Sequence, residues 1–113
     1  MKDARHETML WAAQRVTAAI LAFCVLVHLV TIIYAVRGGL SASAILARTH
    51  GSFPWAAFYT TFVIATAVHA SIGLRAIFAE WLSFKGRAAG VAVVVIGLAL
   101  AGLGVRAVIA VTA

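Results

Sequence analysis

Three long apolar segments, each bordered by polar or charged residues, dominate the pattern of the chain. They cover residues 9–36, 54–78 and 89–112, and each reaches the roughly 20 residues that a membrane-spanning helix needs. The apolar core of a signal peptide has only about 7–15 residues, so we interpret the first segment as a retained span. An isolated strand cannot satisfy its backbone polar groups in lipid. The pattern therefore predicts an all-α integral membrane protein with three transmembrane helices in one domain, residues 1–113.

The polar stretches around these segments predict where the chain leaves the membrane. Residues 1–8 are polar and are expected at the membrane surface. Residues 37–53 are rich in glycine, serine and charge, which predicts a loop with a short helix around residues 42–48. Pro54 opens the second span, because its missing N–H is not needed in a first helical turn. Residues 79–88 form the next turn, so the second span is expected to run antiparallel to its neighbours.

The composition indicates that the bilayer is the solvent of this chain. Of its 113 residues, 65% are hydrophobic and 11% are charged, whereas a soluble domain is about half apolar and a quarter charged. The net charge is +6, but the basic residues sit mainly at the ends of apolar runs. That arrangement is typical of topology signals and excludes a basic surface for nucleic acid. The lone Cys24 lies in mid-span, so no disulfide framework is possible.

Lysine and arginine are unequally divided between the two sides of the membrane. One side is expected to carry Lys2, Arg5, Arg15, Arg75, Lys85 and Arg87, and the other side Arg37, Arg48 and Arg106. Cytoplasmic segments carry an excess of basic residues, so we predict that the N-terminus is inside and the C-terminus outside.

Two of the four histidines, His28 and His69, lie inside predicted spans. An ionisable side chain in the membrane is costly and is by default a candidate for a functional site. The alternative is a neutral imidazole that only hydrogen-bonds a neighbouring helix. The spans hold no carboxylate that could form a proton relay with these histidines. Neutral imidazole is a good metal ligand and the usual axial ligand of haem, which favours haem.

The depths of the two histidines differ. At about 1.5 Å per residue, His28 lies about 7 Å to the outer side of the first span's centre. By the same rise, His69 lies about 5 Å to the cytoplasmic side of the second span's centre. Trans ligands of one iron lie only about 4 Å apart. An offset of about 12 Å favours two haems at different depths, each completed by a histidine of another chain. Gly73, one turn beyond His69, leaves room for a flat macrocycle or, alternatively, for a neighbouring helix.

Two arginines lie a turn or two inside the expected cytoplasmic ends of their spans. Arg15 and Arg75 could extend to the membrane surface along their alkyl chains. Alternatively, their guanidinium groups could pair with a haem propionate or a quinone oxygen. Trp11, Gln14 and Thr17 lie near Arg15 and could line a quinone pocket.

Two motifs resemble those of a known family. HASIGLRAIFAEW, residues 69–81, resembles the H-x-x-x-G-[IL]-R-[HA]-x-x-x-[DE] signature of the cytochrome b anchor subunits of succinate dehydrogenase and fumarate reductase. QRVTA, residues 14–18, resembles the family's H-R-[IV]-[ST]-G. The resemblance implies that His69 ligates haem b and that Arg15 lies by the quinone and the propionates. Gln14 replaces the family's common histidine. LVHLV, around His28, resembles the first helix of members with two haems.

The resemblance also implies a function and partners. The chain would be a haem b-binding membrane anchor subunit of a succinate:quinone oxidoreductase, passing electrons between the iron–sulfur subunit and quinone. Flavoprotein and iron–sulfur subunits would dock on the cytoplasmic face of a bacterial inner membrane. A second anchor subunit, or a second copy, would supply the other half of a dimeric helix bundle. The chain has no flavin motif and no cysteine cluster, so it is not expected to catalyse dicarboxylate chemistry alone.

The alternative is a small non-redox membrane protein, such as a transporter or an assembly subunit, in which both histidines serve packing. The third span carries no residue that distinguishes these functions, and we interpret it as a packing element.

Overall fold

The computed structural model describes residues 2–113, with side chains from residue 3 onward. Met1 and the side chain of Lys2 lie outside the described part, so the contribution of Lys2 to the topology stays a prediction. The helices are α1 (Lys2–Gly38), α2 (Ala42–Thr49), α3 (Phe53–Trp81) and α4 (Arg87–Thr112), and the described residues contain no strand. The three long helices are each long and apolar enough to cross a membrane. The predicted all-α fold with three spans is confirmed.

Helix α1 is longer than the predicted first span, because it begins at Lys2 instead of near residue 9. At about 1.5 Å per residue it is roughly 55 Å long, against roughly 30 Å for the hydrocarbon core. No glycine or proline precedes Gly38, so nothing in the polar first residues interrupts the helix. Asp3 in the first turn also complements the positive end of the helix dipole. The first turns of α1 therefore extend the helix beyond the hydrocarbon core.

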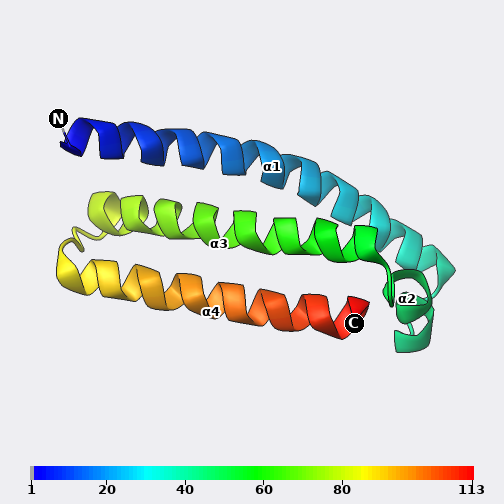
Figure 1. Ribbon diagram of the computed structural model, residues 1–113. Coiled ribbons are helices and arrows are strands. Elements are labelled where there is room, and N and C mark those ends of the chain that lie inside the picture. The colour runs from blue at the N-terminus through cyan, green and yellow to red at the C-terminus, as the bar shows by residue number, and fades with distance from the viewer. Residues whose placement is uncertain (1) are drawn as a thin grey trace.

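In Figure 1, α3 lies between α1 and α4. Helix α3 packs against α1 on one side and α4 on the other. The N- and C-termini lie at opposite ends of the molecule, as three crossings require (Figure 1). Large apolar side chains such as Phe23 and Leu98 are exposed on the outer helices. These surfaces suit lipid or another membrane helix and do not suit water.

Helices α3 and α4 approach closely at two glycines of α4 that are seven residues apart. A Cβ atom added to Gly97 would lie 2.5 Å from Oγ of Ser71, and one added to Gly104 would lie 2.5 Å from Cγ1 of Val63. Small residues of this kind let membrane helices pack backbone to backbone, where no hydrophobic effect drives association. The third span thus serves packing, as the sequence suggests.

The short helix expected in the first loop is present as α2 and is tied to the end of α4. The Ser41 hydroxyl caps its N-terminus. The Thr49 hydroxyl donates to the carbonyl oxygen of Val111 at 2.7 Å, and the Gly51 N–H donates to that of Thr112 at 2.8 Å. These bonds join residues about 60 positions apart, and they hold α2 across one end of the long helices.

Candidate functional site

Several polar side chains of α1 lie on the helix face that meets α3. Gln14, Thr17, Cys24 and His28 follow one another at intervals of three, seven and four residues, which places them on one face of a helix. Cys24 is 2% exposed and Thr17 is 9% exposed. Polar groups in lipid are costly unless a neighbouring helix receives them. This face, which we call the polar seam, is therefore one candidate site on α1.

His69 of α3 contacts the polar seam through one ring nitrogen. Its Nδ1 lies 3.1 Å from Oγ1 of Thr17, and the ring is half-buried between α1 and α3. The same hydroxyl lies 2.7 Å from the carbonyl oxygen of Ala13, one turn back in α1. His69 is thus in contact with a side chain of another membrane-spanning helix.

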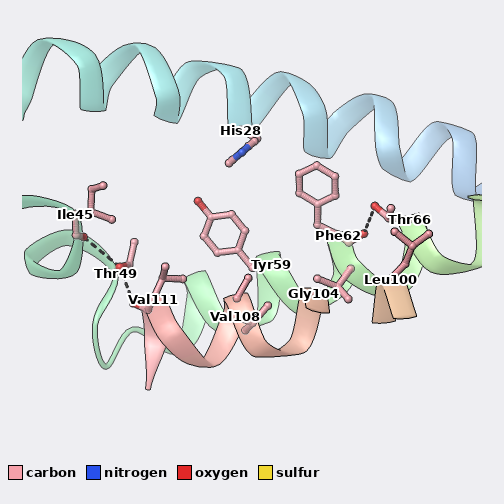
Figure 2. Close-up of a pocket in the computed structure, with 12 residues that line it drawn as sticks. His28, Ile45, Thr49, Tyr59, Phe62, Thr66, Leu100, Gly104, Val108 and Val111 are labelled. Atoms are coloured by element: carbon pink, nitrogen blue, oxygen red, sulfur yellow. Dashed lines mark hydrogen bonds between the residues drawn. The ribbon is translucent and has the colours of Figure 1, made fainter. Parts of the chain in front are cut away.

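His28 of α1 occupies a different, aromatic environment. Its ring meets the edges of Tyr59 and Phe62 of α3, with ring centroids 5.8 and 5.6 Å away (Figure 2). Its Nδ1 is buried and has no hydrogen-bond partner among the described residues. A buried polar atom without a partner is costly, so this nitrogen is available to a further group.

A cavity of about 450 Å³ opens beside His28. Figure 2 shows His28 pointing into it from α1 and Tyr59 from α3, with Thr49 of α2 at one end. Gly104 and Val108 belong to its apolar wall on α4. Its volume lies within the ~300–1,000 Å³ range of small-molecule sites. The cavity can therefore hold part of an apolar ligand.

The two histidines lie at clearly different levels along the helices. His28 faces Tyr59 and Phe62, which precede His69 by ten and seven residues on α3. His69 faces Thr17, which precedes His28 by eleven residues on α1. At about 1.5 Å per residue both counts give a separation of roughly 10–16 Å. One iron cannot bind both rings, because its trans ligands are only about 4 Å apart.

The donors of this chain fit an axial haem ligand better than a conventional metal site. The described residues contain no group of three or more His, Cys, Asp or Glu side chains that could hold a metal ion. Each of the two half-buried histidines can therefore contribute a single nitrogen from this chain. Haem needs only one or two axial ligands, because its macrocycle supplies the others. A histidine of another chain would have to complete a bis-histidine pair.

The residues predicted to form a quinone site divide between two faces of α1. The guanidinium carbon of Arg15 lies 5.3 Å from the Trp11 ring centroid, and both side chains are exposed. Gln14 instead turns toward α3, where a Cβ atom added to Gly73 would lie 3.3 Å from Nε2 of Gln14. Within this chain Gly73 thus serves helix packing, and its contact with a macrocycle stays a prediction. Arg75 is exposed.

Three features of the site were not anticipated from the sequence. The pattern groups Thr17 with Arg15, whereas its hydroxyl contacts His69. Phe62, which lies two helical turns before His69 on α3, packs against His28. The pattern assigns no contact to Tyr59. A usable signal is the spacing of eleven residues between Thr17 and His28, which is three helical turns and places both on the face that meets α3.

Fold and site together define a multi-pass membrane protein with a histidine of each of two adjacent spans at a helix interface. The family comparison is more specific. Residues 1–109 match the succinate dehydrogenase/fumarate reductase transmembrane subunit, and the chain belongs to this family. No curated protein and no solved structure matches the chain. The matched region contains α1, α2 and α3 and nearly all of α4, so it extends beyond the two motifs.

Proposed function

We propose that this chain is the haem b-binding membrane anchor of a succinate:quinone oxidoreductase and helps to pass electrons between an iron–sulfur subunit and quinone. The observation that carries this proposal is His69: a half-buried imidazole inside a span, held through one nitrogen at a helix interface, in a chain of this family. In a family whose complexes carry out redox chemistry, a histidine inside a span has a role available to it beyond packing. Family membership therefore favours the anchor over a transporter.

Of the two proposed haems, His69 would bind the one that lies nearer the N-terminal end of α1. When bound there, haem b would supply reversible one-electron chemistry. The chain's own task is to hold the imidazole, to exclude water and to balance charge. Arg15 and Arg75 both lie on the side of His69 nearer the N-terminus of α1, and both are exposed. Their guanidinium groups can bind anionic propionates in a bidentate manner, and Arg15, with Trp11 and Gln14, can contact a quinone oxygen.

His28 is the proposed ligand of a second haem near the opposite end. Two features support this assignment, namely the partnerless Nδ1 of a ring in an aromatic pocket and the adjoining apolar cavity. The separation of roughly 10–16 Å from His69 requires that any haem at His28 be a different one. Each would need its second ligand from a partner chain, either another anchor subunit or a second copy.

The proposed orientation follows from charge. Arg5, Lys85 and Arg87 are exposed around the N-terminus of α1 and the loop before α4, which lie at the same end of the molecule (Figure 1). Basic ends of membrane proteins face the cytoplasm. We therefore propose that this end faces the cytoplasm and that the chain lies in a bacterial inner membrane. The flavoprotein and iron–sulfur subunits would bind at this face.

Purification through a tag on this chain from its native membrane tests the proposal. We expect flavoprotein and iron–sulfur subunits to copurify, and the dithionite-reduced minus oxidised spectrum to contain the Soret and α bands of haem b. A stable complex with both subunits but no haem absorption would support the anchor role and contradict the proposed electron transfer through haem. Purification without these subunits would contradict the proposed assembly.

A further inference from the structure

The contact between Thr17 and His69 determines which ring nitrogen of His69 carries the proton. Oγ1 of Thr17 lies 2.7 Å from the carbonyl oxygen of Ala13, 3.2 Å from that of Gln14 and 3.1 Å from Nδ1 of His69. A hydroxyl has one proton to donate and two lone pairs to accept with. A carbonyl oxygen can only accept, and the contact with Ala13 is the shortest of the three, so we assign the hydroxyl proton to Ala13.

Once that proton points to Ala13, the contact with His69 can be a hydrogen bond only if Nδ1 carries a hydrogen. The Nδ1–H group then donates to Oγ1 of Thr17. A neutral imidazole has one N–H, so Nε2 is left with its lone pair free. In this tautomer Nε2 would be the nitrogen that is free to bind a ligand.

We propose that Thr17 is the positioning residue of His69: it accepts the Nδ1 proton, sets the tautomer and orients the ring for axial ligation through Nε2. This inference rests on the proposed function, since it concerns how His69 would bind haem. Ligating histidines in proteins almost always donate their other N–H to a second group, which fixes the ring and raises its basicity. In the described residues, Thr17 is the protein group that makes such a bond with His69.

The surroundings of Thr17 make it a firm support. Thr17 is 9% exposed, and its hydroxyl is anchored to the backbone of its own helix. A hydrogen bond in such a low-dielectric environment is stronger than one in water. His28 offers a contrast within the same molecule, because its Nδ1 has no partner and the nearby Thr31 hydroxyl donates only to the His28 backbone carbonyl. The two half-buried histidines therefore differ in whether another side chain holds the ring.

The test compares variants of the whole purified complex. Thr17→Val removes the acceptor at nearly constant volume, and Thr17→Ser retains it. Thr61→Val is the matched control, because Thr61 also lies in a span and its hydroxyl bonds only the Ala57 carbonyl of its own helix at 2.9 Å. Haem retention during dilution and the haem midpoint potential, from a spectroscopic redox titration, are the two measurements.

In Thr17→Val we expect haem affinity at His69 to fall about tenfold, the smaller effect typical of lost partners of metal-bound histidines. A less basic imidazole stabilises ferric iron less, so the midpoint potential should rise. A tenfold loss confined to the ferric state corresponds to a rise of about 59 mV for one electron. Thr17→Ser should restore both values toward wild type, and Thr61→Val should leave both unchanged.

The outcomes separate this inference from the proposed function. If the wild-type complex holds no haem, or if His69→Ala retains all of it, the proposed function is wrong. If His69 binds haem but Thr17→Val matches Thr61→Val in affinity and potential, Thr17 has no positioning role. If Thr17→Val fails to assemble, Thr17→Ala replaces it. A change in haem affinity and midpoint potential in Thr17→Ala that is absent from Thr17→Ser supports the inference. Equal values in Thr17→Ala and Thr17→Ser overturn it.

Discussion

The packing of α4 on α3 gives a sharp test of the fold, because two nearby glycines of α4 have opposite surroundings. A Cβ atom added to Gly104 would lie 2.5, 2.8 and 3.2 Å from Cγ1, Cγ2 and Cβ of Val63. A Cβ atom added to Gly102 would meet nothing within 4 Å. The substitutions Gly104→Ala and Gly102→Ala therefore add the same methyl group to the same helix, once into a neighbour and once into open space.

The expected difference can be worked from these distances. Each change gains helix propensity, up to about 1 kcal/mol, so this gain cancels between the two variants. The remaining term is the clash with Val63, whose branched side chain is stiff at χ1 and cannot turn all three atoms away. Overpacking of this kind costs about 1–3 kcal/mol of the free energy of unfolding. At about 4 °C or more per kcal/mol, Gly104→Ala should unfold at least about 4 °C below Gly102→Ala.

Cys24 provides the assay, because it is the chain's one cysteine and is buried at α1. Samples in detergent are heated in the presence of a maleimide, and the labelled fraction is read from the intact mass of the chain. Unfolding exposes the thiol, so the midpoint of labelling reports the stability of each variant. Midpoints that agree within about 1 °C would show that α4 does not approach α3 at Gly104, since the clash term is at least about 1 kcal/mol.

Three further outcomes follow from the site. His28→Ala should remove one haem per complex and leave the haem of His69, as counted by pyridine haemochrome assay; an unchanged count would assign His28 to packing. Arg15→Gln should raise the KM for quinone about tenfold or more while haem content is retained, since hydrogen bonds to charged groups contribute about 1.5–3 kcal/mol; an unchanged KM would exclude Arg15 from the quinone site. Thr49→Val should cost about 1–2 kcal/mol of stability through loss of the bond to Val111, and a thermal midpoint equal to wild type would contradict this.

The spans could be predicted from the sequence because lipid imposes a simple rule on length and apolar content. At the N-terminus α1 extends beyond the apolar segment, because hydropathy marks the edge of the hydrocarbon and not the end of the helix. The first residues lack glycine and proline, and α1 continues through them to Lys2. The short helix before α3 was predictable in kind, but its bonds to the end of α4 join residues about 60 positions apart and have no local signal.

The candidate site residues could be named from the sequence, but their contacts could not. His28 and His69 stand out in any hydropathy pattern, and rise per residue alone gives an offset close to that in the structure. The partner of each ring depends instead on the register and rotation of α1 against α3, which one sequence does not specify. For this reason Thr17 was grouped with Arg15 by position, although its hydroxyl turns to His69. Gly73 likewise accommodates Gln14 of the neighbouring helix.

The most direct test of the central claim is a count of haem in the purified complex before and after His69→Ala. His50→Ala is a suitable control, because His50 is exposed in the loop between α2 and α3. Pyridine haemochrome assays should show that His69→Ala lacks one haem per complex, whereas His50→Ala matches wild type. An assembled His69→Ala complex with the full wild-type haem content would contradict the assignment of His69 as a haem ligand.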